Sequence, residues 1–403
     1  MPETMNRRDF LKTGAAGMAG SAFLAACSRS APQKQSQERK LIYRTLGRTG
    51  LRLPVVSMGS AYAVDLVRAA HAEGIVYIHT SSSYSERNHE RLLGAALRDL
   101  PRDSFVIASG PDLPYQLDRG RDLSLDLGTG TDPGLIPKSL EGSLQRLGLG
   151  YVDIYYFCSI GRRETALHEP YLKAFEQLKT SGKARFLGIG THANEPEVIR
   201  AAAESRFWDV VLTAYNFRQS HREDVRAAIG EAAQAGLGVV AMKTQAGVYW
   251  DRTRRKINMK AALKWVLQDE NVHTAIPAFS NYEEMQEDLS IMDNLALTPE
   301  ERQDLRLGEE MGLSGMYCQQ CGRCRAQCPA EMDIPLLMRA AMYAFGHERP
   351  ERARHMLRAW TPADVPCRRC AGCDVRCKLG LDVRSSALAV ALLLDGREEI
   401  SMI

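Results

Sequence analysis

Eight of the ten cysteines of this 403-residue chain lie in two short runs near its C-terminus. The runs read CQQCGRCRAQCP from Cys318 and CRRCAGCDVRC from Cys367, and both have the spacing C-x2-C-x2-C-x3-C. This spacing is typical of the thiolate ligands of bacterial [4Fe–4S] clusters. Because one cubane cluster takes four thiolates, the two runs are enough for two clusters. The spacing therefore predicts a one-electron redox role for this end of the chain.

The division of the cysteines between the clusters follows from the same pattern. In two-cluster ferredoxins the fourth cysteine of each run binds the other cluster. We therefore expect one cluster on Cys318, Cys321, Cys324 and Cys377, and the other on Cys328, Cys367, Cys370 and Cys373. Zinc and disulfides also use closely spaced cysteines, but neither explains two four-cysteine runs of identical spacing.

The N-terminus carries a targeting motif. Arg7 and Arg8 precede Phe10, and a weakly apolar stretch of small residues then runs to Cys27. Residues 1–27 resemble a twin-arginine export signal, whose substrates cross the membrane already folded. That route suits a protein whose clusters are inserted in the cytoplasm. We therefore expect export to the periplasm or the cell envelope.

Cys27 also ends a sequence, LAAC, that resembles a lipoprotein cleavage box. In that interpretation Cys27 is lipidated and anchors the mature protein to the membrane. The alternative is a chance cysteine after a small-residue cleavage site. Residues 28–40 are polar without apolar periodicity, as expected of a linker.

Short apolar segments alternate with amphipathic ones between residues 41 and 295. The eight candidate strands are Val55–Gly59, Ile75–His79, Phe105–Ser109, Asp153–Cys158, Phe186–Gly190, Val210–Thr213, Val239–Lys243 and Thr274–Ala278. This alternation predicts an α/β fold of the closed parallel (β/α)8 TIM-barrel type. A linker helix at 296–314, a small α-helical ferredoxin-like domain with two [4Fe–4S] clusters at 315–380 and a C-terminal helix and tail at 381–403 complete the predicted organisation.

Several segments of this predicted barrel resemble the aldo-keto reductases. YRTLGRTGLRLPVVSMGS from Tyr43 resembles their N-terminal hairpin and first strand, and GIVYIHTSSSY from Gly74 resembles their second strand and catalytic loop. LGLGYVDIYYF, ARFLGIGTHAN, AYNF, VVAMKTQAG and AIPAFSNYEEMQEDL continue the match in order. Within the family, the subgroup with a C-terminal two-cluster domain fits best. The resemblance implies a TIM barrel and oxidoreductase activity.

Family members use an Asp, Tyr, Lys and His tetrad, in which the Tyr gives a proton to the carbonyl while nicotinamide delivers hydride. The resemblance places Tyr84 at the Tyr position, but His79 at the Asp position, Gly110 at the Lys position and Cys158 at the His position. A tyrosine without a cationic neighbour is a poor acid near neutral pH. A site rewired around Tyr84, with His79 or Lys243 polarising it, is one hypothesis, and structural roles for these residues are the alternative.

The cofactor loop also departs from the family. Members that prefer the phosphorylated cofactor offer Lys or Arg after the eighth strand, whereas residues 278–288 here offer none and contain four acids. Gly190, Thr191 and Ser280 could still contact a nucleotide. The sequence therefore disfavours NAD(P), and free nicotinamide cofactors are scarce outside the cytoplasm.

The net charge of +3 excludes little, but residues 318–378 have eleven Lys and Arg against six acids. This excess either neutralises the clusters or attracts an acidic redox partner protein, and no aromatic platform favours nucleic acid.

We expect an exported iron–sulfur oxidoreductase or electron-transfer protein with a small-molecule substrate at the barrel mouth. The alternatives are a catalytically silent scaffold for docking in a periplasmic redox complex, and a nicotinamide-dependent carbonyl reductase with a rewired site.

Overall fold

The computed structural model describes residues 40–84, 88–114, 116–117, 125–219, 221–245, 258–310, 318, 322–346, 350–377 and 380–396. Lys40–Ile403 forms one compact unit. In the described part of this unit, no helix is both long enough and apolar enough to cross a membrane.

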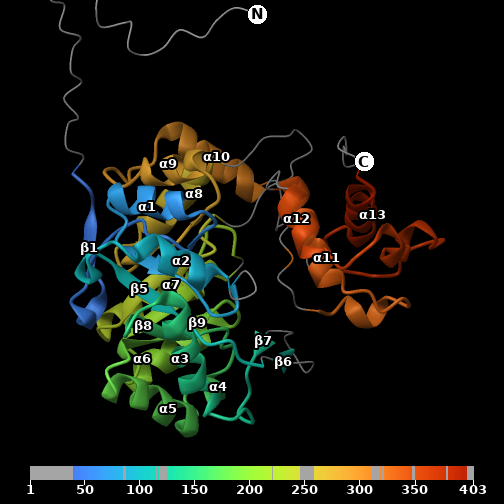
Figure 1. The fold of residues 1–403 in the computed structure, drawn as a ribbon. Helices are drawn as coiled ribbons and strands as arrows, with labels where there is room; N and C mark the ends of the chain where they lie inside the picture. Colours follow the sequence, from blue (N-terminus) through green and yellow to red (C-terminus); the bar gives the residue numbers. More distant parts are fainter. Residues whose placement is uncertain are drawn as a thin grey trace, which may run out of the picture. The chain divides into compact units, whose positions relative to one another are not determined.

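A seven-stranded sheet lies inside the part of this unit that precedes α10 to α13 (Figure 1), and its strands follow the order β12-β11-β10-β9-β8-β5-β4. Every neighbouring pair is parallel. The strands are β4 (Tyr77–His79), β5 (Val106–Ser109), β8 (Val152–Phe157), β9 (Ala184–Thr191), β10 (Val210–Ala214), β11 (Gly238–Met242) and β12 (Thr274–Ala275). Parallel pairing in sequence order confirms the predicted α/β class.

The first predicted strand, Val55–Gly59, is not a regular strand, and that prediction is corrected. Val56 instead forms a single bridge to Ala275 of β12, and Met58 forms one to Ile78 of β4. The His79 N–H donates to the Met58 carbonyl at 2.8 Å, and the Ser57 N–H donates to the Ala275 carbonyl at 2.8 Å. This segment touches each neighbour through only one or two residues, so it links the two edge strands without forming a long ladder with either.

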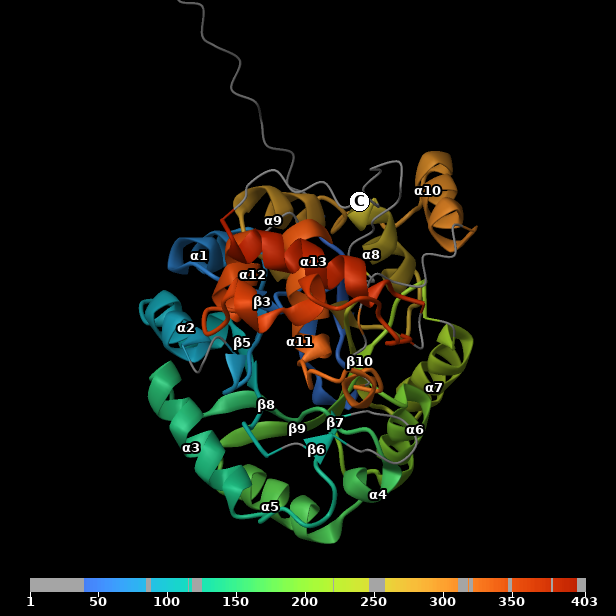
Figure 2. The same ribbon diagram turned by 90° about the vertical axis from the view of Figure 1, so that its right-hand side faces the viewer.

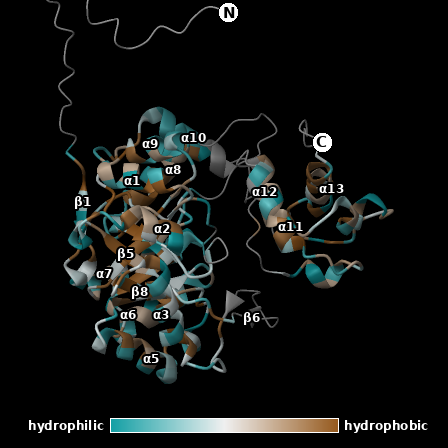
Figure 3. Ribbon diagram, viewed as in Figure 1, coloured by the Kyte–Doolittle hydropathy of each residue, from teal (hydrophilic) through white to brown (hydrophobic). Residues whose placement is uncertain are grey.

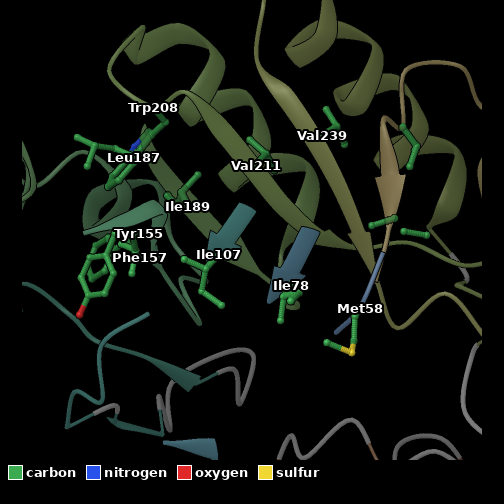
Figure 4. Packing of buried hydrophobic residues seen from close by; sticks show 14 of the residues in the cluster. Met58, Ile78, Ile107, Tyr155, Phe157, Leu187, Ile189, Trp208, Val211 and Val239 are labelled. Carbon is green, nitrogen blue, oxygen red and sulfur yellow. The ribbon is translucent and has the colours of Figure 1, made fainter. Parts of the chain in front are cut away.

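Helices surround the sheet (Figure 2) and bury their apolar faces against it. They are α1 (Val64–Ala72), α2 (His89–Leu97), α3 (Leu135–Leu147), α4 (Arg163–Ala166), α5 (Glu169–Thr180), α6 (Glu195–Ser205), α7 (Arg222–Gln234), α8 (Met259–Leu267) and α9 (Tyr282–Leu289). Strand residues such as Ile107, Phe157 and Val239 are fully buried in this layer (Figure 4). Hydrophobic residues accordingly gather on the strands and polar ones on the outer helix faces (Figure 3).

Short elements complete the barrel part. The pairs are β1 (Tyr43–Thr45) with β2 (Arg52–Pro54), β3 (Ser60–Ala61) with β13 (Ala278–Phe279), and β6 (Gln116–Leu117) with β7 (Leu125–Asp126), and the 3-10 turns are η2 (Gly47–Thr49) and η4 (Arg102–Ser104). Gly47 has φ +47°, and a Cβ there would lie 2.3 Å from the Gly238 nitrogen. Only glycine therefore lets this turn approach β11 so closely.

The C-terminal part has a hydrophobic core of its own, built around Leu337, Leu357 and Val390. Its elements are α11 (Ile334–Ala341), the π-helix η6 (Met342–Gly346), α12 (Pro350–Met356), α13 (Val383–Leu394) and the 3-10 turns η5 (Arg325–Gln327), η7 (Pro362–Asp364) and η8 (Pro366–Arg368). The helix α10 (Pro299–Glu310) precedes this part, and its Leu305 packs with Ala261 of α8. The residues of α13 form a helix, as the sequence predicts, and pack against α11.

Candidate functional site

The carboxyl ends of parallel strands meet at one edge of the sheet, here called the barrel mouth. His79 ends β4 and Thr191 ends β9, while Cys158 directly follows β8 and Lys243 directly follows β11. The sheet therefore brings four of the residues singled out in the sequence to the same edge. Tyr84 lies in the loop that follows β4.

His79 is buried, with 2% of its surface exposed. Its ring lies 6.1 Å from the ring of Tyr84 and 5.4 Å from that of Tyr156, both in edge-on geometry. Burial, His89 and Lys243 together lower the pKa of His79 to about 3, so the imidazole is neutral in ordinary buffers. Its Nδ1 atom is buried and has no hydrogen-bond partner among the described residues.

Tyr84 keeps 38% of its surface exposed. The protein around the phenol raises the pKa of Tyr84 to about 12, and Lys243 counteracts this only in part. The hydroxyl therefore stays protonated near neutral pH and acts as a hydrogen-bond donor. Lys243 is the cation beside Tyr84 that the sequence analysis considered.

Two of the three missing tetrad positions, Gly110 and Cys158, are neighbours in the structure. A Cβ atom on Gly110 would lie 2.8 Å from the Cys158 sulfur and 3.0 Å from the Tyr156 carbonyl oxygen. Burial raises the pKa of the Cys158 thiol to about 12, so it is neutral. These positions therefore supply neither the cation nor the imidazole that the family uses.

Lys243 is held in an unusual backbone conformation, with φ +56°. Non-glycine residues rarely adopt this region, and they do so where the surrounding structure fixes them. The side-chain amide of Asn216, which is 8% exposed, donates to the Lys243 carbonyl at 3.1 Å. The side chain of Lys243 itself is exposed at the barrel mouth.

Ser280 and the residues after it do not fit a phosphorylated nicotinamide cofactor. The Ser280 N–H donates to the carboxylate of Glu284 at 3.0 Å, and the Asn281 side chain caps α9 by accepting from the Glu284 N–H at 2.8 Å. The N-terminus of α9 thus already has an anion of its own, and no Lys or Arg lies between residues 274 and 295. Asn281 and Glu284 therefore form the helix start.

The other two predicted nucleotide contacts lie at the end of β9. The Thr191 hydroxyl donates to the Ala193 carbonyl at 2.7 Å, which closes its own turn. Gly190 packs against Cys158, whose Cα would lie 3.4 Å from a Cβ added to the glycine. The Thr191 hydroxyl is therefore already engaged within the protein.

The two cysteine runs enter the core of the C-terminal part. Cys324 and Cys367 are buried there, and Cys318, Cys328, Cys373 and Cys377 pack against the same core. Gln327 of the first run and Arg376 of the second are joined by two hydrogen bonds, one from the Arg376 N–H at 2.6 Å and one to its carbonyl at 3.3 Å. The runs, which lie far apart in sequence, are therefore adjacent. Cys321 and Cys27 lie outside the described residues.

The surroundings of Cys367 fit one predicted ligand set. Burial raises the pKa of Cys367, and the thiols of Cys370, Cys373 and Cys328 raise it further. Among the described residues no three His, Cys, Asp or Glu side chains converge on a single metal ion. A cubane cluster does not require such convergence, because each of its four thiolates binds a different iron atom.

Sequence reasoning missed two polar residues at the start of α2. His89 lies 6.0 Å from Tyr84 and 6.3 Å from Tyr62 between ring centres, and its Nδ1 is 2.7 Å from the Thr80 hydroxyl. Glu90, fully buried, accepts from Ser109 and from Arg146, each at 2.7 Å. The consecutive polar residues His89 and Glu90 before an apolar run were the signal that could have identified them.

Comparisons with known proteins identify a family and a targeting signal. The sequence model of the Aldo/keto reductase family matches residues 46–260, and that of the twin-arginine translocation pathway signal sequence matches residues 4–23. The L-galactose dehydrogenase of Arabidopsis thaliana is 32% identical over 37% of this chain and 48% of its own length. The NADH-specific methylglyoxal reductase of Escherichia coli (strain K12) is 30% identical over 43% and 56%. The chain thus spans about half the length of these two curated relatives.

Solved structures show the same fold. The aldo-keto reductase AKR11C1 from Bacillus halodurans, in its holo form, superposes with a TM-score of 0.53 at 20% identity, covering 69% of this chain and 99% of that one. A similarity at this level of identity concerns the fold alone.

Proposed function

Because this chain belongs to the aldo/keto reductase family and carries a twin-arginine signal sequence, we propose that it is an exported iron–sulfur oxidoreductase. Its substrate is a small carbonyl compound or the corresponding alcohol, bound at the barrel mouth. The two forms differ by two electrons and two protons, and the electrons are exchanged with a one-electron carrier protein. When bound, two [4Fe–4S] clusters supply one-electron chemistry at the C-terminal part.

The observation that carries this proposal is the grouping of cysteines from both runs. Cys328 of the first run and Cys370 and Cys373 of the second act on the thiol of Cys367, and Cys328 and Cys373 pack against the same apolar core as Cys367. This set equals the four ligands expected when the fourth cysteine of one run serves the cluster of the other. Two disulfides within each run would not explain why cysteines of both runs are grouped.

At the barrel mouth the chain supplies a donor and a cation in place of the tetrad. The Tyr84 hydroxyl, protonated near neutral pH, donates a hydrogen bond to the substrate oxygen. The Lys243 ammonium, which acts on both Tyr84 and His79, stabilises negative charge that develops on that oxygen. His79 is neutral near pH 7, and the described residues leave its buried Nδ1 without a hydrogen-bond partner.

The signal sequence supports a location for the mature protein. Export by the twin-arginine route would carry it out of the cytoplasm, and the periplasm or cell envelope is the location that we propose. Lipidation of Cys27 would anchor it to the membrane. Replacing Cys27 with Ala is expected to move the exported protein from the membrane fraction to the soluble one. Equal membrane retention of the variant would contradict the anchor.

A second candidate function is NADH-dependent carbonyl reduction. Its support is the 30% identity to a reductase named as NADH-specific, together with the acids of α9, which oppose a 2′-phosphate but not a free ribose. It requires a hydride site that works with Tyr84 alone of the family tetrad. The cluster-linked proposal does not have this requirement.

The test is anaerobic and uses the cluster-loaded mature protein. Reduced methyl viologen, a one-electron donor, is expected to bleach the cluster absorbance, and a panel of small aldehydes and ketones is expected to restore it. Tyr84→Phe should slow the restoration at least about 100-fold, as loss of a positioned proton donor does, without slowing the bleaching. Lys173→Ala, an exposed lysine paired with Glu169, serves as the control and should change neither step.

The outcomes separate the candidates. Bleaching by one equivalent of NADH with turnover would favour the nicotinamide-linked enzyme. Bleaching by viologen that no carbonyl compound reverses would favour the silent scaffold that docks electron carriers. Restoration equally fast in Tyr84→Phe would remove the proposed site at the barrel mouth.

A further inference from the structure

Two exposed arginines of the C-terminal part bind main-chain oxygens of the second cysteine run. The Arg376 guanidinium donates to the Cys373 carbonyl at 2.8 Å, and the Arg384 guanidinium donates to the Cys370 carbonyl at 3.2 Å. Because Cys370 and Cys373 are expected ligands of one cluster, both positive charges are held beside the same proposed redox centre. These two arginines are called the arginine patch below.

The position of Arg376 is fixed by a side chain of the first run. Its N–H donates to the Gln327 side-chain oxygen at 2.6 Å, and the Gln327 amide donates to the carbonyls of Arg376 and Arg323 at 3.3 and 3.1 Å. Arg384 belongs to the first turn of α13, which packs against α11. Both cations of the patch are therefore attached to backbone that other parts of the C-terminal core hold in place.

Few carboxylates lie near the patch. Residues 367–384 contain four arginines and one lysine against two aspartates, Asp374 and Asp382. Within the described part of the chain, neither Arg376 nor Arg384 forms an ion pair with a carboxylate. The Ser385 N–H and, to a smaller extent, the charge of Arg384 lower the pKa of Asp382, whose two oxygens accept from Ser385 at 2.9 and 2.7 Å. Asp382 thus caps α13, and the patch presents its positive charge to solvent.

Other arginines of the two runs are neutralised. Arg325 of the first run pairs with Asp333 at 2.7 Å, and Arg368 of the second pairs with Asp395. Neutralising the clusters is the simplest role for the remaining cations, but solvent screens an exposed guanidinium, so it contributes little to a charge inside the core. The same exposed charge does attract an oppositely charged protein from solution.

The proposed cluster beside the patch comes near the surface. Its expected ligands Cys328, Cys370 and Cys373 are half-buried, and only Cys367 is buried. Because electron transfer slows steeply with distance, a carrier protein has to dock where the ligands of a cluster approach the surface. The arginine patch lies at such a place, since it is bonded to the carbonyls of two of these ligands.

We propose that the arginine patch is the docking surface for an acidic one-electron carrier protein. In each encounter one electron passes between the carrier and the cluster on Cys328, Cys367, Cys370 and Cys373, so one partner is oxidised as the other is reduced. This inference rests on the proposed function, since it names the charge of the carrier and the place where it binds. Anionic lipids also attract arginines, but they accept no electrons, so a carrier protein suits a patch beside a redox centre better.

The test uses two oxidised one-electron carriers of opposite charge, plastocyanin, an acidic copper protein, and cytochrome c, a basic haem protein. The cluster-loaded protein is reduced with viologen, mixed with either carrier in a stopped-flow instrument, and the second-order rate constant is read at low and high salt. We expect the plastocyanin rate to fall at least about 10-fold as the salt is raised, and the cytochrome c rate to stay unchanged or rise.

Variants locate the effect on the surface. Arg376→Gln with Arg384→Gln should lower the plastocyanin rate at low salt by about 10-fold or more, whereas Arg376→Lys with Arg384→Lys, which keeps both charges, should stay within about twofold. Arg384→Gln alone should give part of the loss, and it leaves the bond between Arg376 and the second run intact. Arg325→Gln is the matched control, because it removes one positive charge elsewhere in the C-terminal part and should stay within about twofold.

An equal loss of rate in Arg325→Gln and Arg384→Gln would overturn the inference, because net charge alone would then explain it. The same salt dependence for both carriers would overturn it as well. Binding to phosphatidylglycerol vesicles that requires the patch, with a plastocyanin rate that does not, would assign the patch to a membrane instead. Iron content and viologen bleaching are read in the same samples. Intact clusters with any of these results would remove the docking surface alone, whereas protein without iron would remove the proposed function itself.

Discussion

Iron content in cysteine variants tests the proposed cluster ligands directly. With two cubane clusters, anaerobically reconstituted protein is expected to contain about eight iron atoms per chain. Cys370→Ala removes one of the thiols that act on Cys367, so it should lower this value to about four. Cys328→Ala should do the same, although it belongs to the other run. Cys158→Ala, at the barrel mouth, is the control and should leave the content unchanged.

Double variants give the sharper result because they depend on how the runs share the clusters. If Cys328 and Cys370 bind the same cluster, the double variant keeps about four iron atoms, no fewer than either single variant. Combining Cys370→Ala with Cys318→Ala should remove both clusters and leave almost no iron. If each run instead holds its own cluster, Cys328→Ala with Cys370→Ala should lose nearly all the iron.

The assay is iron and acid-labile sulfide analysis together with cluster absorbance, on protein whose folding is checked by circular dichroism. Iron and sulfide should fall together in each variant. An unchanged iron content in Cys370→Ala would refute the ligand assignment. Stoichiometric zinc without sulfide in the unaltered protein would refute the clusters altogether.

Three further outcomes follow from the barrel. His79 has a pKa of about 3 in the folded protein against 6.5 in the unfolded chain, so between these pH values the unfolded chain binds one more proton and stability falls on acidification. This loss amounts to at most about 1.4 kcal/mol of unfolding free energy per pH unit below pH 6.5. His79→Gln should abolish it, as measured by urea unfolding. A Cβ on Gly188 would lie 2.3 Å from the Tyr156 ring, so Gly188→Ala should lower the free energy of unfolding by about 1–3 kcal/mol. A melting temperature equal to that of the unaltered protein would contradict this packing. Glu90→Ala removes the carboxylate that pairs with the guanidinium of Arg146 and should lower the free energy of unfolding by about 3–5 kcal/mol in the same urea assay.

The fold was largely predictable because its signals are local. Parallel strands buried on both faces give continuous apolar runs, and these placed β8, β10 and β11 to within about two residues. The segment Val55–Gly59 has the same apolar signal but pairs through single bridges, since pairing depends on neighbours that are more than 200 residues away in the case of Ala275. Periodicity could not have shown that difference.

The site was predictable only in part. Strand ends identified His79 and Lys243 because parallel topology fixes where they must lie. The strained backbone of Lys243 and its bond from Asn216 depend on three separate loops, so no local pattern reports them. The start of α9 is another example, because Ser280 and Asn281 are both good capping residues and only the backbone geometry decides that Asn281 caps the helix.

Two departures from the family tetrad, at Gly110 and Cys158, are linked by packing. A Cβ atom at position 110 would meet the Cys158 sulfur at 2.8 Å and the Tyr156 carbonyl at 3.0 Å, so a lysine there requires the Cys158 side chain to move and the backbone at Tyr156 to shift slightly. Tyr156 in turn depends on the missing side chain of Gly188 and bonds Tyr77 at 3.0 Å. Restoring the lysine alone therefore disturbs buried contacts of β8, whereas Lys243, which acts on both Tyr84 and His79, is already a cation at the same edge of the sheet.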